Sequence, residues 1–166
     1  EFVHINEIAT DAVGSAHLLN FDSAHGRWSH KAQAQGDSIV IEGPTISYSS
    51  CAAIEDFDWG ASNVDIVLEC TGVFRNREQV QPYCDQGVKQ VIVAAPFKEG
   101  VKNLLMGIND DEFVAGEDSL ITAASCTTNC IAPVIKVLHE QVGISHGCIT
   151  TMHDRTNTQK VVDHGH

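Results

Sequence analysis

Basic residues are scarce in this sequence. Ten lysines and arginines stand against 22 aspartates and glutamates, so the formal net charge is −12 at pH 7. A chain this acidic repels phosphate backbones and anionic lipid surfaces, so nucleic acid and membrane are not expected partners. Long apolar runs are also missing: none approaches the roughly 20 residues of a membrane span, and no secretory signal is visible. We therefore expect a cytoplasmic protein.

Repeats, low-complexity tracts and Gly/Ser linkers are absent as well. The 166 residues, 43% of them hydrophobic, suit one domain, or one domain plus part of another. The sequence opens at Glu1 inside a strand-like pattern and stops at His166 without a helix cap. We expect this chain to be a fragment of a longer protein.

The six cysteines do not form a pattern typical of a disulfide framework. They fall in or near apolar, strand-like runs such as VDIVLECTG, residues 64–72. A chain of this size does not depend on disulfides, so we expect buried, reduced thiols. The sequence contains no CxxC pair and no HxxxH pair that could complete the four ligands of a zinc site, so no metal is expected.

Strand-like and helix-like segments alternate along the chain. Helices are expected at residues 10–21, 76–87 and 126–143, with a helical turn at 110–115. A small antiparallel excursion is expected at residues 27–50, where short alternating runs are broken by glycine. Apolar strands are expected at residues 1–7, 63–72, 88–96, 103–109, 119–125 and 144–154. This order predicts an α/β fold with a mainly parallel sheet covered by helices on both faces.

Cys126 is the first candidate for chemistry. It follows an expected strand and opens an expected helix, where backbone N–H groups and the helix dipole favour a thiolate and can hold an oxyanion. Ser125 and Thr127 flank it with hydroxyl groups. Cys130 lies one turn further along the same face, and an inward-facing structural thiol fits it better than a metal ligand. A buried structural cysteine remains the alternative for Cys126.

Candidate partners for these groups lie at other strand ends. His153 ends the last expected strand and is a possible base for a thiol, although a lone histidine is often structural. Thr156 follows it in a loop rich in hydroxyl groups, which suits phosphate or a helix cap. Glu7 ends the first strand, where a carboxylate can accept the ribose hydroxyls of NAD and repel the 2′-phosphate of NADP. Thr71 and Gly72 end another strand and are placed to contact a ligand.

Several segments together resemble the phosphorylating glyceraldehyde-3-phosphate dehydrogenase family. ASCTTNC, residues 124–130, is similar to the family's active-site segment, and TTMHDRTNTQ, residues 150–159, is similar to TTVHxxTxTQ. FDSAHGRW, VLECTGVF and MGIN also resemble family segments and occur in the same order. The resemblance covers nearly the whole chain.

The resemblance implies an incomplete Rossmann-type doubly wound parallel sheet followed by the start of an α+β catalytic domain. Residues 1–125 would form the NAD-binding domain without its first strand and Gly-rich turn, and residues 126–166 would begin the catalytic domain. Cys126 would be the nucleophile and His153 the general base. Asn6, Glu7, Thr71 and Gly72 would bind NAD, and Ser125, Thr127 and Thr156 would bind the phosphate groups.

The implied reaction oxidises glyceraldehyde 3-phosphate through a thiohemiacetal and a thioester, with inorganic phosphate as acyl acceptor, in a homotetramer. The chain departs from the family pattern at two places: it has HDRT where HAYT is common, and AAPF in place of a SAPS-like turn. The HDRT segment, together with EFVHINE, resembles the branch of the family found beside arsenic-resistance transporters, in which arsenate is the acyl acceptor. The isolated chain is expected to show little or no turnover. The alternatives are a non-catalytic fragment and a redox or metal module built on Cys126 and Cys130.

Overall fold

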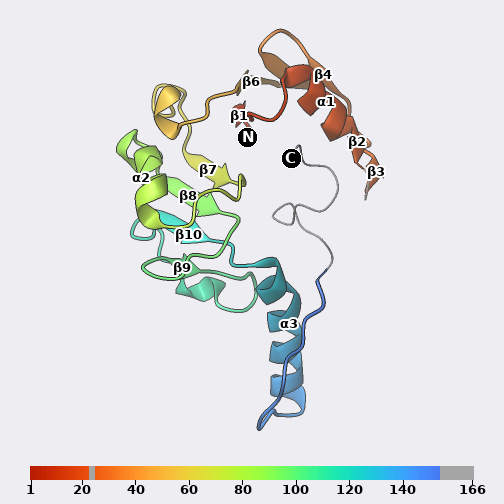
Figure 1. The fold of residues 1–166 in the computed structure, drawn as a ribbon, viewed down its shortest axis with the longest axis vertical. Coiled ribbons are helices and arrows are strands. Elements are labelled where there is room, and N and C mark those ends of the chain that lie inside the picture. The colour runs from red at the N-terminus through yellow and green to blue at the C-terminus, as the bar shows by residue number, and fades with distance from the viewer. Residues whose placement is uncertain (23–24, 154–166) are drawn as a thin grey trace, which may run out of the picture. The chain divides into compact units, whose positions relative to one another are not determined.

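A computed structural model describes residues 1–22 and 25–153 of the chain. The chain folds as two compact units, residues 1–124 and 125–166. The first contains every strand that the structure describes, and the second begins with a long helix (Figure 1).

The N-terminal part of the first unit is a four-stranded mixed sheet in the order β1-β6-β5-β4. Its outer strand β1 runs parallel to β6, whereas β6, β5 and β4 follow one another antiparallel, as the alternating runs at residues 27–50 predict. The elements are β1 (His4–Asn6), α1 (Ala12–Asn20), β4 (Ala32–Ala34), β5 (Ser38–Ile41) and β6 (Thr45–Ser49). A short antiparallel pair, β2 (Phe21–Asp22) and β3 (Gly26–Arg27), follows α1.

Helix α1 lies within the helix that the sequence predicts at residues 10–21, and Asp11 caps it. The Asp11 carboxylate accepts a hydrogen bond of 2.8 Å from the Gly14 backbone N–H, which satisfies one of the free donors of the first turn. Ala12 and Ala16 then face the sheet and pack against the fully buried Ile39. The small alanine side chains let the helix lie close to the strands.

The second sheet is fully parallel and has the order β7-β8-β10-β9. Its strands are β7 (Ile66–Glu69), β8 (Gln90–Val93), β9 (Lys102–Asn103) and β10 (Leu120–Thr122). Connections between and before these strands contain α2 (Arg77–Asp85) and the short 3-10 helices η1 (Ile54–Asp56) and η2 (Asp110–Glu112). The predicted α/β class with a parallel sheet is therefore confirmed.

One face of this parallel sheet carries the main core. Val67, Val91 and Val93 point to the same side and pack with Val80 and Tyr83 of α2. Alternate residues of β7 point the other way, because successive side chains of a strand lie on opposite faces. Ile66 and Leu68 are accordingly 56% and 54% exposed. The expectation that β7 is covered on both faces is wrong for the part of the chain that the structure describes.

Two expected strands are also wrong. Within residues 103–109 only Asn103 belongs to a strand; the Asn109 side chain accepts from the Leu105 N–H and donates to the Asn103 carbonyl, which bends the backbone into turns. Gly107 adopts a φ of 75°, which extended structure excludes. Residues 144–153 contain no strand, and no described strand pairs with them to form a ladder.

Candidate active site

Cys126 is the first residue of α3 (Cys126–Gln141). Ser125 caps the helix: its hydroxyl accepts a 3.0 Å hydrogen bond from the Thr128 N–H and lies 2.7 Å from the Thr128 hydroxyl. The thiol is exposed, and the first turn of the helix contains no acidic residue. The positive end of the helix dipole therefore acts on an accessible sulfur without a competing carboxylate in that turn.

The backbone immediately before the helix is in an unusual conformation. Ala124 has a φ of +57°, in the left-handed region that is unfavourable for a residue with a Cβ. Its side chain is buried, and its N–H donates to the Thr122 hydroxyl at 3.1 Å. Strained backbone of this kind concentrates at functional sites, and the sequence gives no signal for it because alanine is common in ordinary turns.

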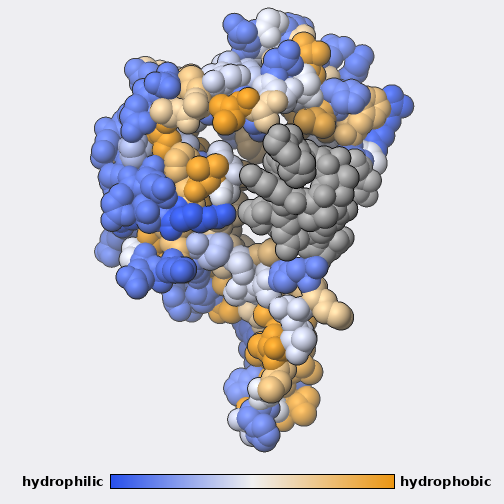
Figure 2. Space-filling view, in the orientation of Figure 1, coloured by the Kyte–Doolittle hydropathy of each residue, from blue (hydrophilic) through white to orange (hydrophobic). Residues whose placement is uncertain are grey.

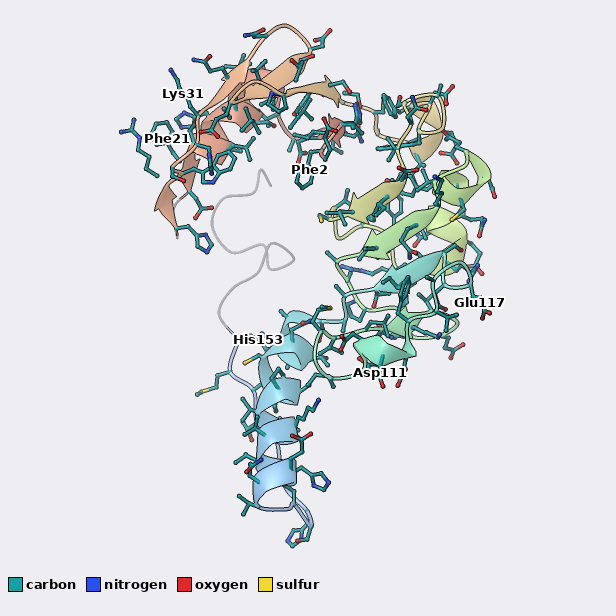
Figure 3. All side chains as sticks on the ribbon, turned by 180° about the vertical axis from the view of Figure 1, so that it is seen from behind. Phe2, Phe21, Lys31, Asp111, Glu117 and His153 are labelled. Atoms are coloured by element: carbon teal, nitrogen blue, oxygen red, sulfur yellow. The ribbon has the colours of Figure 1, made fainter. Side chains whose placement is uncertain are left out.

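His153 lies beside the first turn of α3, as Figure 3 shows. Its Nε2 atom is 3.0 Å from the Thr127 hydroxyl, and both side chains are accessible to solvent. The structure thus brings together two residues that the sequence assigned to one site, 26 positions apart. Thr156, the third residue expected to bind phosphate with Ser125 and Thr127, lies outside the described residues.

The cysteines are unpaired but are not buried as expected. Cys51 and Cys84 are half-buried, and the other four thiols are exposed, including Cys130. An inward-facing Cys130 is therefore wrong, because no residue of α3 is buried among the described residues. Figure 2 shows apolar side chains on the surface of this helix. Its exposed apolar residues include Val134, Ile135, Val137 and Leu138. In the described part of the chain no three His, Cys, Asp or Glu residues cluster as metal ligands do.

Asn6, expected at the cofactor, forms three side-chain hydrogen bonds within the first unit. Its oxygen accepts from the Cys51 N–H at 2.8 Å and from the Ser49 hydroxyl at 2.7 Å, and its nitrogen donates to the Cys51 carbonyl at 2.9 Å. These bonds tie the end of β1 to the chain that leaves β6. Asn6 therefore shapes this strand end.

Glu7 follows β1 and is half-buried. One carboxylate oxygen accepts a 2.8 Å hydrogen bond from the Ala9 N–H, and the Glu7 N–H donates to the Ser49 carbonyl at 3.0 Å. The carboxylate is thus held at the carboxyl end of a parallel strand. Ligands of open α/β sheets bind at such ends, and a carboxylate suits the hydroxyl pair of a ribose.

Thr71 and Gly72 form the turn after β7. Both are exposed, and Gly72 has a φ of +69°. A Cβ atom at Gly72 would meet only the Arg75 guanidinium, at 3.9 Å, so the turn leaves open space beside its backbone. This arrangement fits the close approach of a cofactor to the main chain.

Sequence reasoning missed Glu69, the last residue of β7, which lies two positions before Thr71. The residue is 3% exposed, and its carboxylate is hydrogen-bonded to Thr71 and Tyr83. The available signal was a charged residue inside an otherwise apolar strand, VDIVLEC.

Two models of one protein family match this chain, one in its N-terminal part and one in its C-terminal part. The family model "Glyceraldehyde 3-phosphate dehydrogenase, NAD binding domain" matches residues 1–77, and the model of the C-terminal domain of the same family matches residues 125–166. The chain belongs to the glyceraldehyde-3-phosphate dehydrogenase family. The resemblance seen in the sequence is therefore confirmed.

Individual members of the family match along the whole chain. It is 53% identical over 166 residues to glyceraldehyde-3-phosphate dehydrogenase 3 of Nostoc sp., and 42% and 41% identical to the glyceraldehyde-3-phosphate dehydrogenases of Geobacillus stearothermophilus and Thermotoga maritima. In each case the match covers 100% of this chain and 49% of the relative. The chain thus spans about half the length of the curated relatives it matches. Among the described residues, no helix is long and apolar enough to cross a membrane.

Proposed function

We propose that this chain contributes to an NAD-dependent glyceraldehyde-3-phosphate dehydrogenase that uses Cys126 as its nucleophile. The observation that carries the proposal is the exposed Cys126 thiol at the first position of a 16-residue helix capped by Ser125. At this position the sulfur is accessible to a carbonyl carbon, and the unpaired N–H groups of the first helical turn can stabilise the oxyanion that its attack forms. Family membership supplies the substrate class, because the relatives carry this activity in their names.

In the proposed reaction the Cys126 sulfur adds to the aldehyde carbon and forms a thiohemiacetal. His153 is the candidate base for the hydroxyl proton of this adduct. NAD, when bound, supplies the acceptor for the hydride that leaves the same carbon. The thioester that results on Cys126 is then attacked by an oxyanion, which releases the acyl product and returns the thiolate.

The acceptor in the last step is a tetrahedral oxyanion, inorganic phosphate or arsenate. Ser125 and Thr127 offer hydroxyl groups beside the sulfur, and Thr127 lies 3.0 Å from the His153 ring. A cluster of hydroxyls and N–H groups at a helix start suits either anion. The ratio of kcat/KM for phosphate to kcat/KM for arsenate in the complete gene product decides between them.

The cofactor half of the proposal places NAD at two strand ends of the first unit. Glu7 would accept the ribose hydroxyls, and Thr71 and Gly72 would border the cofactor together with Asn6. We assign residues 1–125 to cofactor binding and residues 126–166 to the start of the catalytic domain. A cytoplasmic homotetramer is the proposed assembly.

The alkylation rate of each cysteine, followed by peptide mass spectrometry across the pH range, tests the nucleophile. Cys126 should react faster than the exposed Cys148, because the unpaired N–H groups of the first turn of α3 lie next to its sulfur. His153→Ala should reduce that advantage. Equal profiles for the exposed cysteines would contradict the proposal.

The stoichiometry of oxidant or zinc uptake separates the proposed enzyme from a thiol module built on Cys126 and Cys130. A redox or metal module predicts that oxidant or zinc uptake requires both cysteines in equal measure. The enzyme requires Cys126 alone.

A further inference from the structure

Glu69 places a carboxylate in the core at the end of β7. Among the described residues, two polar side chains are buried, Glu69 and Thr122, and Glu69 is the one that carries a charge. Burial of a carboxylate is costly unless hydrogen-bond donors replace the lost water. The donors that Glu69 uses therefore indicate what the residue does.

Both donors on one oxygen belong to the next turn. Oε1 of Glu69 accepts from the Thr71 N–H at 2.6 Å and from the Thr71 hydroxyl at 2.5 Å. Hydrogen bonds to an ionised acceptor are short and about twice as strong as neutral ones. The carboxylate thus fixes both the amide plane and the side-chain rotamer of Thr71.

The constraint continues to the far side of the turn. The Thr71 hydroxyl, with its proton directed at Glu69, accepts a 3.2 Å hydrogen bond from the Val73 N–H. Gly72, at φ +69°, lies between the two fixed residues. One carboxylate oxygen therefore determines the path of three consecutive residues.

The other oxygen is held from helix α2. Oε2 of Glu69 accepts from the Tyr83 hydroxyl at 3.3 Å. Burial, together with the Glu69 carboxylate, raises the pKa of Tyr83, so its hydroxyl remains protonated and donates. The Tyr83 ring is itself fixed by an edge contact with Trp59, at 5.0 Å between centroids. The carboxylate cannot rotate away from the turn without losing this bond.

We propose that Glu69 is a positioning residue that holds the Thr71–Gly72–Val73 turn in the conformation that accepts the nicotinamide cofactor. The inference rests on the proposed function, which places NAD beside Thr71 and Gly72. Glu69 would not touch the cofactor itself and would act on its binding through Thr71. The energetic logic is preorganisation: a turn fixed before binding loses little conformational entropy when NAD arrives.

Glu69→Gln is the decisive substitution, because it keeps the shape and removes the charge. A neutral amide has one acceptor oxygen, which cannot accept from Thr71 and Tyr83 at both original positions. In the complete gene product we expect the Kd for NAD, measured by calorimetric titration, to rise about tenfold. We expect KM for NAD to rise in parallel, with kcat and KM for the aldehyde nearly unchanged.

A second readout needs no cofactor. Amide hydrogen exchange of Thr71 in the NAD-free protein should accelerate in Glu69→Gln, because the bond to the carboxylate protects that N–H. Val80→Ala is the matched control: it creates a cavity at a fully buried position of α2 and lowers stability without touching the turn. The control should lower the melting temperature at least as much as Glu69→Gln and leave the Kd for NAD within about twofold.

The outcomes distinguish a failure of the proposed NAD binding from a failure of the positioning role of Glu69. No NAD binding by the wild-type protein would overturn the proposed function and this inference with it. Binding by the wild type with an unchanged Kd in Glu69→Gln would overturn the positioning role alone. An equal loss of affinity in Val80→Ala would reduce Glu69 to a structural residue.

If Glu69→Gln fails to fold, Tyr83→Phe tests the same link with little change in volume. It removes the donor to Oε2 and leaves both bonds to Thr71 possible. A Kd for NAD raised severalfold with faster Thr71 exchange would support the inference. Unchanged values of both would contradict it.

Discussion

The Thr127 hydroxyl lies 3.0 Å from Nε2 of His153. Thr127 belongs to the first turn of α3, and His153 follows that helix by more than ten residues in an exposed segment without regular structure. His153, the candidate base, therefore contacts Thr127, a candidate ligand of the phosphate. This geometry suggests that the two residues act on the same part of the reaction.

Removal of the Thr127 hydroxyl should impair the step in which phosphate is used. We expect Thr127→Val to lower kcat/KM for phosphate roughly three- to tenfold, the effect of one lost hydrogen bond. Thr127→Ser keeps the hydroxyl and should stay within about twofold of wild type. Equal losses in both variants would show that the hydroxyl alone does not account for the effect.

The two cysteines of α3 should differ sharply in activity assays. Cys126→Ser should abolish NADH formation from glyceraldehyde 3-phosphate, because a serine hydroxyl at this position is a far weaker nucleophile than a thiolate. Cys130→Ser is the matched control, since Cys130 is also exposed and lies one turn further along the helix. Comparable loss of activity in both variants would favour the thiol-pair alternative.

Glu7 should determine the choice of cofactor. Its carboxylate, held by the Ala9 N–H at 2.8 Å, would accept ribose hydroxyls and repel a 2′-phosphate. We expect Glu7→Ala to reduce the ratio of kcat/KM for NAD to that for NADP about tenfold or more. Glu7→Asp retains the charge and should preserve the preference. An unchanged ratio in Glu7→Ala would remove this role from the residue.

Stability should decrease on mild acidification because of His4. The ring stacks on Phe57 at 3.9 Å, and burial lowers the pKa of the His4 imidazole from its usual 6.5. Between that lowered value and 6.5 the unfolded chain binds more protons than the folded one, so stability rises with pH through this window. The free energy of unfolding in urea should therefore be lower below this window than at about pH 7.5.

The variant His4→Gln isolates this contribution. It lacks the titrating ring, so part of the pH dependence between these conditions should vanish. The exposed His146→Gln is the control and should retain the wild-type dependence. Identical pH profiles for wild type and His4→Gln would exclude the effect.

Local patterns in the sequence predicted most of the regular elements. The helices expected at residues 10–21, 76–87 and 126–143 form as α1, α2 and α3, and the side chains of Asp11, Asn76 and Ser125 each accept a backbone N–H in the first turn. The apolar runs at 66–69, 90–93 and 120–122 form the strands β7, β8 and β10. Such signals are local: a cap or an apolar run needs only its neighbours in the chain, so the sequence alone carries them.

Expectations that depend on distant partners fared worse. Residues 104–109 look apolar enough for a strand, but the Asn109 side-chain amide closes them into turns through its bonds to the Leu105 N–H and the Asn103 carbonyl. Residues 144–153 have a strand-like composition without a described strand to pair with. The inward position of Cys130 failed for a similar reason, because burial depends on what packs against a helix and not on the helix pattern.

The sequence by itself determined the family, the α/β class and the position of Cys126 at the start of a helix, because each follows from contiguous residues. Only the tertiary structure placed the His153 ring beside Thr127 and the Glu69 carboxylate on the Thr71 turn. It also revealed the left-handed Ala124 and the engaged amide of Asn6. These features depend on hydrogen bonds and packing between groups whose meeting the folded backbone decides.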